Sequence, residues 1–126
     1  MAKNELDGFV IFRANRSGYD MSVGLIICNT GMRLTDGAYR QCGCPEYVNV
    51  FFDEAGKRMM LKKAEKNMAN VYKLSGKYIT STTVRTHMLY IAGASAERGA
   101  SLRIEGHNPG APNTIIFDLS KCQVLK

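Results

Sequence analysis

The residues of this chain best suited to chemistry are cations that could bind phosphate groups, and most of them lie close together. The chain has 126 residues and a net charge of +6. Seven cations and one acid, Glu65, lie between residues 57 and 77, so this segment holds the whole excess. The seven cations are Lys57, Arg58, Lys62, Lys63, Lys66, Lys73 and Lys77. Such clustering is typical of a surface that binds a polyanion. Lysines that protect an edge strand from aggregation would give the same pattern.

Two tyrosines are interleaved with the last of these cations. Tyr72 precedes Lys73, and Tyr78 follows Lys77. Aromatic rings beside cations can stack on bases or nucleotides. A segment packed against the core would give the same spacing, so two interpretations of these tyrosines stay open.

The cysteines and histidines form no catalytic or metal-binding pattern. The cysteines are Cys28, Cys42, Cys44 and Cys122. The "CGC" at residues 42–44 is not the C-x-x-C of a zinc site and has no second pair to complete one. His87 and His107 are isolated in the sequence, and no nucleophile elbow, phosphate-binding Gly-rich loop or H-E-x-x-H pattern occurs. We therefore expect a protein that is not an enzyme and has no metal or cofactor.

The length and the apolar pattern predict one cytoplasmic domain over residues 1–126. No apolar run approaches the roughly 18 residues needed to span a bilayer. The N-terminal "MAKNELDGFVIF" places two acids before its apolar run, unlike a signal peptide. We expect no membrane partner and reduced thiols.

The first half of the chain predicts strands, a short helix and a β-hairpin. Strands are expected at 8–13 and 21–29. Thr35 or Asp36 is expected to cap a short helix that Gly43 ends in the left-handed conformation. Alternation then predicts a hairpin with arms at 47–53 and 57–63, and its turn places Gly56 where a positive φ is needed.

The second half repeats this order after a polar, basic linker at 64–76, in which "VYKL" is expected to be extended. A strand at 77–81 leads to a helix capped by Ser81, Thr82 or Thr83 and ended by Gly93. Its apolar side is expected to hold Val84, Met88 and Ile91, with Leu89 beside them. Strands at 100–106 and 114–119 form a second hairpin, and "CQVL" a last short strand.

The repeated order predicts an α+β, mostly β fold made of two copies, residues 21–63 and 77–119. Each copy contains a strand, a short helix and a β-hairpin. We expect the copies to form a compact sheet or barrel-like pseudo-dimer. The cations of the return strand of the first hairpin have no counterpart in "NTIIFDL" of the second, which contains no cation.

Residues 32–64, "MRLTDGAYRQCGCPEYVNVFFDEAGKRMMLKKA", resemble the AbrB/MazE/SpoVT swapped-hairpin module. The matching features are Leu34-Thr35 at the helix start, Cys42-Gly43 at its end, "YVNV" in the first arm and "DEAG" in the turn. The chain is also similar to uncharacterised phage and prophage proteins of Firmicutes type. The resemblance implies exchanged hairpins, a homo-oligomer, and DNA binding through basic residues on one face. The further basic residues that it implicates are Arg13, Arg16, Arg33 and Arg40.

Three functions follow as hypotheses. The first is an AbrB-like DNA-binding regulator. The second is a phage-type anti-defence protein in the host cytoplasm, which inhibits a host immune effector or sequesters an anionic, for example cyclic, nucleotide. The third is a structural module whose charge only keeps it soluble. The expected partners are accordingly a nucleic acid, a nucleotide or a host defence protein.

Overall fold

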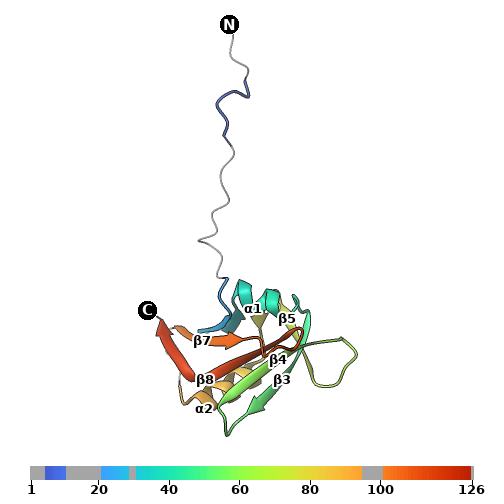
Figure 1. The fold of residues 1–126 in the computed structure, drawn as a ribbon, viewed down its shortest axis with the longest axis vertical. Coiled ribbons are helices and arrows are strands. Elements are labelled where there is room, and N and C mark those ends of the chain that lie inside the picture. Colours follow the sequence, from blue (N-terminus) through green and yellow to red (C-terminus); the bar gives the residue numbers. More distant parts are fainter. Residues whose placement is uncertain (1–4, 11–20, 29–30, 95–100, 126) are drawn as a thin grey trace.

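The strands of the chain form a closed antiparallel ring. The computed structural model describes residues 5–10, 21–28, 31–94 and 101–125. Around the ring the strands follow the order β1-β2-β6-β5-β3-β4-β8-β7. In Figure 1 the helix α1 lies at the upper end of the strands, and α2 lies next to β8 in the lower part of the view. The expected α+β, mostly β fold class is confirmed. The elements are β1 (Gly24–Cys28), β2 (Gly31–Leu34), α1 (Asp36–Gln41), β3 (Tyr47–Asp53), β4 (Arg58–Ala64), β5 (Val71–Ser75), β6 (Tyr78–Ile79), α2 (Thr82–Ala92), β7 (Ser101–His107) and β8 (Thr114–Leu125).

The first segments differ from the sequence prediction. Residues 8–10 of the expected strand at 8–13 form no strand, and residues 11–13 lie outside the described part. The expected strand at 21–29 is β1, but β2 was not predicted. β2 has only four residues; it pairs with β1, its neighbour in the sequence, and its Met32 pairs with the distant Ile79 of β6.

Thr35, one of the two caps that the sequence predicts, caps helix α1 and also connects it to β1. The buried Thr35 Oγ1 accepts hydrogen bonds from the Ala38 N–H at 3.2 Å and from the Gly24 N–H at 3.0 Å. The same hydroxyl donates to the Ser22 carbonyl at 2.5 Å. Gly43 has the predicted positive φ of 80° after the helix.

The first hairpin is confirmed, with Tyr47 opposite Ala64 and Asp53 opposite Arg58. The prediction of a positive φ at Gly56 is wrong, because Lys57 has it instead, at 51°. Gly56 is needed for space, since a Cβ there would lie 2.4 Å from Asp53 Oδ2. The Asp53 carboxylate accepts the Gly56 N–H at 3.0 Å, and this bond closes the turn.

Residues 71–75 of the expected linker form β5, in agreement with the expected extended "VYKL". This strand pairs with β3, where Lys73 lies opposite Tyr47. It also pairs with β6, where Ser75 lies opposite Tyr78. The part of the linker outside regular strands is therefore shorter than predicted, and its second half belongs to the ring.

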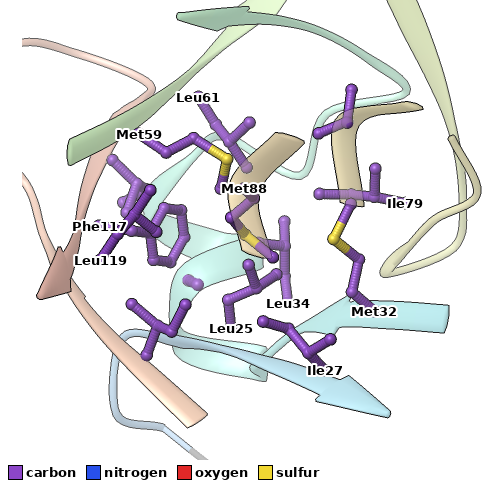
Figure 2. Packing of buried hydrophobic residues seen from close by; sticks show 14 of the residues in the cluster. Leu25, Ile27, Met32, Leu34, Met59, Leu61, Ile79, Met88, Phe117 and Leu119 are labelled. Atoms are coloured by element: carbon purple, nitrogen blue, oxygen red, sulfur yellow. The ribbon is translucent and has the colours of Figure 1, made fainter. Parts of the chain in front are cut away.

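Helix α2 follows its prediction closely. Ser81 caps it by accepting the Val84 N–H at 3.2 Å, and Gly93 ends it with a φ of 65°. Val84, Met88 and Ile91 are its buried residues, as expected. Figure 2 shows Met88 among side chains contributed by several strands. The buried side of α2 therefore packs into the interior of the ring, whereas its other side, with Tyr90, is exposed.

The last two expected strands are one, since β8 runs unbroken from 114 to 125. Residues 116–117 and 122–125 of β8 pair with β7, with a register shift between Ile104 and Gly106. At Gly106 a Cβ would lie 2.9 Å from the Phe117 ring, so this position leaves room for that buried side chain. No helix within the described ranges is long and apolar enough to cross a bilayer.

Candidate nucleic-acid interface

The predicted tyrosines, Tyr72 on β5 and Tyr78 on β6, lie on different sides of the sheet. Leu74 is buried, and Tyr72, two residues earlier, faces the same way and packs against the core. Lys73 and Ser75 alternate with them and are exposed. Tyr78 is likewise outward, since its neighbour Ile79 is buried while Tyr78 is 52% exposed. Tyr72 and Tyr78 therefore form no stacking pair.

Four adjacent strands place tyrosines and cations side by side on the outside of the ring. Tyr47 lies opposite Lys73, and Ser75 lies opposite Tyr78. Tyr78 in turn lies opposite Arg33. Directly opposite residues of antiparallel strands have Cβ atoms roughly 4.5–5.5 Å apart. We call these five residues, Tyr47, Lys73, Ser75, Tyr78 and Arg33, the outer row.

One end of the outer row borders a cleft of about 770 Å³. Its lining consists of Arg33, Tyr39, Ser75, Gly76, Lys77 and Tyr78, and we call it the tyrosine cleft. Lys77 forms an ion pair with Asp36 at the start of α1. Arg33 has no ion pair within the described residues. The cleft thus combines aromatic rings with one uncompensated guanidinium group.

Tyr78 also borders a second, smaller cleft of about 190 Å³. Thr80 and Ser81, between β6 and α2, and Thr82, the first residue of α2, line this cleft with their hydroxyl groups. Arg85 lies there too, and its guanidinium group donates to the Cys28 carbonyl at 2.7 Å. The Tyr78 side chain therefore borders both the tyrosine cleft and this smaller cleft, which is lined mainly by hydroxyl-bearing residues.

The other end of the outer row borders a cleft of about 560 Å³. Its lining consists of Cys44, Glu46, Tyr47, Lys63, Ala64, Glu65, Lys66 and Lys73, and we call it the lysine cleft. Three lysines and two acidic residues line this cleft, so its net charge is positive. The Lys63 ammonium donates to the Gly43 carbonyl at 3.1 Å, which holds one lysine at the rim.

The thiols nearest this cleft differ in accessibility. Burial raises the pKa of the Cys42 thiol from 9.0 to about 11, and the backbone and charge of Lys63 offset this only in part. Its Sγ lies 3.5 Å from the Asn113 carbonyl oxygen. Cys44 is exposed at the lysine cleft. Cys42 is therefore protonated at neutral pH. Among the described residues, no group of His, Cys, Asp and Glu side chains could hold a metal ion.

The remaining predicted cations are spread more widely. Lys62 lies on the outside of β4 opposite Asn49, and Lys57 is exposed at the hairpin turn. Arg58 is engaged in the hairpin, since its Nη2 lies 2.8 Å from Asp53 Oδ2. Arg40 is exposed in the last turn of α1. Arg13 and Arg16 lie outside the described residues.

His87 has a structural environment away from these clefts. Its Nε2 lies 3.1 Å from the Glu54 carboxylate, and its ring meets Phe52 edge to face at 4.6 Å. These contacts join α2 to the first hairpin. His107 is exposed on β7, opposite Ile116.

Tyr47, Tyr39 and Ser75 were missed as candidate site residues. The alternation of Tyr47 with the buried Val48 indicates an outward tyrosine. Nothing local in the sequence predicts that β3 pairs with β5, and this pairing brings Tyr47 beside Lys73.

Comparison with protein-family models, with curated proteins and with solved structures gives no significant match.

Proposed function

We propose that this chain is a nucleic-acid-binding protein without enzymatic activity, and that its exposed lysines neutralise phosphates. One observation carries the proposal: the lysine-bearing strands are not edges. β4 pairs with both β3 and β8, and β5 pairs with both β3 and β6. Lysines protect edge strands against aggregation, and a closed ring has no such edge to protect. The charge on these strands therefore needs another reason.

Five lysines of the 57–77 segment support phosphate binding as the reason for this charge. All five are exposed, and none forms an ion pair in the part of the chain that the structure describes. They are Lys57, Lys62, Lys63, Lys66 and Lys73. Uncompensated cations attract a polyanion and release its counterions on binding.

The ring order also supports the proposed duplication and the AbrB-like assignment. Exchanging β1–β4 for β5–β8 leaves the order of strands around the ring unchanged. Residues 24–64 and 71–125 then each form a strand-strand-helix-strand-strand unit, which extends the predicted copies by one strand each. A single chain would thus provide the paired modules that the resemblance expects from a dimer. A regulator of this kind binds DNA through one face of the pair.

An anionic nucleotide is the second candidate ligand, favoured by the tyrosine cleft. A volume of about 770 Å³ lies within the range of small-molecule sites. A tyrosine ring and the Arg33 guanidinium suit a base and a phosphate respectively. This role would fit a protein that sequesters a nucleotide signal during host defence.

Binding of fluorescent oligonucleotides at low salt tests the proposal. Glutamine at Lys62, Lys66 and Lys73 together should weaken binding by about tenfold or more, because phosphate contacts are lost. Lys121→Gln is the control for loss of one exposed lysine outside the basic segment; Lys121 is 77% exposed on β8, and its Nζ lies 3.9 Å from Asp118 Oδ2. The absence of binding to any oligonucleotide, or equal losses in the two variants, would contradict the proposal. Calorimetric heat with mononucleotides alone would favour the second candidate.

A further inference from the structure

We infer that the outer row binds single-stranded rather than duplex nucleic acid, with an unpaired base stacked on Tyr78. This rests on the proposed function and specifies its ligand. Tyr78 is 52% exposed, although it lies on a strand of the ring. An exposed aromatic ring next to cations stacks on a base of any sequence. Bases of a duplex are already stacked and paired, so a tyrosine on a sheet reaches only an unpaired one.

The cations near Tyr78 are placed for the phosphates beside such a base. Arg33 is its direct cross-strand partner, and Lys77 immediately precedes it in the chain. Arg33 forms no ion pair in the described ranges, so its guanidinium group is available to a phosphate. Lys77 already pairs with Asp36 and would have to share its ammonium group. Arg33 is therefore the principal phosphate ligand expected at this end.

The outer row continues from Tyr78 toward a second tyrosine and further lysines. It crosses β5 at Ser75 and Lys73 and reaches Tyr47 on β3. Two strand spacings across and two residues along β5 separate the Cα atoms of Tyr78 and Tyr47 by about 12 Å. A strand of a few nucleotides spans this distance. Its phosphates would pass Lys73 and enter the lysine cleft, where Lys63 and Lys66 lie.

Tyr78→Leu removes the ring but keeps an apolar side chain, whereas Tyr78→Phe keeps the ring. Tyr90→Leu is the matched control, because Tyr90 is 78% exposed on α2 and lies outside the outer row. The probes are a fluorescent single-stranded 12-nucleotide DNA, its duplex, and an abasic strand with the same backbone. Thermal unfolding of each variant checks that it is folded. Because the chain has no tryptophan and six tyrosines, the difference in tyrosine quenching between wild type and Tyr78→Leu reports stacking on Tyr78.

The inference predicts that the single strand binds more tightly than the duplex. Tyr78→Leu should lose roughly 5- to 150-fold in affinity for the single strand and little for the abasic strand. Tyr78→Phe and Tyr90→Leu should both bind as the wild type does. If all strands bind but Tyr78→Leu behaves as wild type, or if the duplex binds more tightly, the inference fails and the proposed function stands. If no strand binds the wild type, both fail.

Discussion

Arg33 on β2 and Tyr78 on β6 are direct cross-strand partners on the outside of the ring. They come from segments more than forty residues apart and meet only because β2 and β6 join the two halves of the chain. Tyr78 gives this place an exposed ring, and Arg33 gives it a charge without an ion pair among the described residues. The pair therefore offers an aromatic ring on which a base can stack and a cation that can bind a phosphate.

Arg33→Gln should weaken binding of single-stranded DNA and reduce its salt dependence. Removing one phosphate contact lowers the slope of log affinity against log salt by about 0.7 for a single strand. Since the Tyr78 ring remains, the preference for a base-bearing strand over an abasic one should persist. Anisotropy titrations over a salt series measure both quantities. An unchanged slope would show that Arg33 contacts no phosphate.

Cys44 provides a chemical probe of the lysine cleft. It is exposed there, whereas Cys42 is fully buried. A maleimide reagent followed by mass spectrometry should label Cys44 first and Cys42 only on unfolding. Saturating oligonucleotide should slow labelling of Cys44 and leave that of Cys28 unchanged. Equal labelling rates at Cys44 with and without bound oligonucleotide would place the ligand elsewhere, and Cys44→Ser identifies the fast site.

Cys42 should make the protein less stable at alkaline pH. Burial raises its pKa from 9.0 to about 11 in the folded state, so the folded protein holds this proton more tightly than the unfolded chain. The resulting stabilisation is fully present below about pH 9 and is lost as the pH rises through about 11. The difference amounts to roughly 2–3 kcal/mol in the free energy of unfolding. Denaturant unfolding from about pH 8 to pH 11 should therefore show a steeper loss for wild type than for Cys42→Ala. Parallel curves would refute this.

Thr35→Val should cost more stability than Ser81→Ala, although both replace helix caps. The buried Thr35 hydroxyl accepts from the N–H groups of Gly24 and Ala38, and both would lose their partner. Two unsatisfied buried donors cost about 2–4 kcal/mol. Ser81 is only partly buried and holds one N–H, so its loss costs about 1 kcal/mol. Urea unfolding compares the two variants, and similar losses would mean that the Thr35 bonds outside α1 contribute little.

Features with local causes were predictable from the sequence. The capping hydroxyls of Thr35 and Ser81 and the helix end at Gly93 depend on neighbouring residues. Thr35 and Ser81 are each among the predicted alternatives, and Gly93 ends the helix where it was predicted. The buried side of α2 follows from helical spacing, and the first hairpin follows from alternation. The prediction of a positive φ at Gly56 was wrong, because Lys57 adopts it. The turn has glycine at residue 56 because a Cβ there would meet the Asp53 carboxylate.

Features with distant causes were not predictable. β2 is too short to show a pattern and exists through its pairing with β1 and β6. The sequence prediction divided β8 into a strand at 114–119 and a separate "CQVL", but β8 is continuous and its pairing with β7 extends to Leu125. The candidate site depends on the same pairings, because they decide that Tyr47, rather than Tyr72, lies beside Lys73 on the outside.

The salt dependence of oligonucleotide binding tests the central proposal most directly. We predict that log affinity of the wild type for a single strand falls linearly with log salt. The slope should decrease by about 2 when Lys62, Lys66 and Lys73 are replaced by glutamine, and should not change in Lys121→Gln. Binding that is insensitive to salt, or an equal slope in the triple variant and the wild type, would contradict the proposal that these lysines bind phosphates.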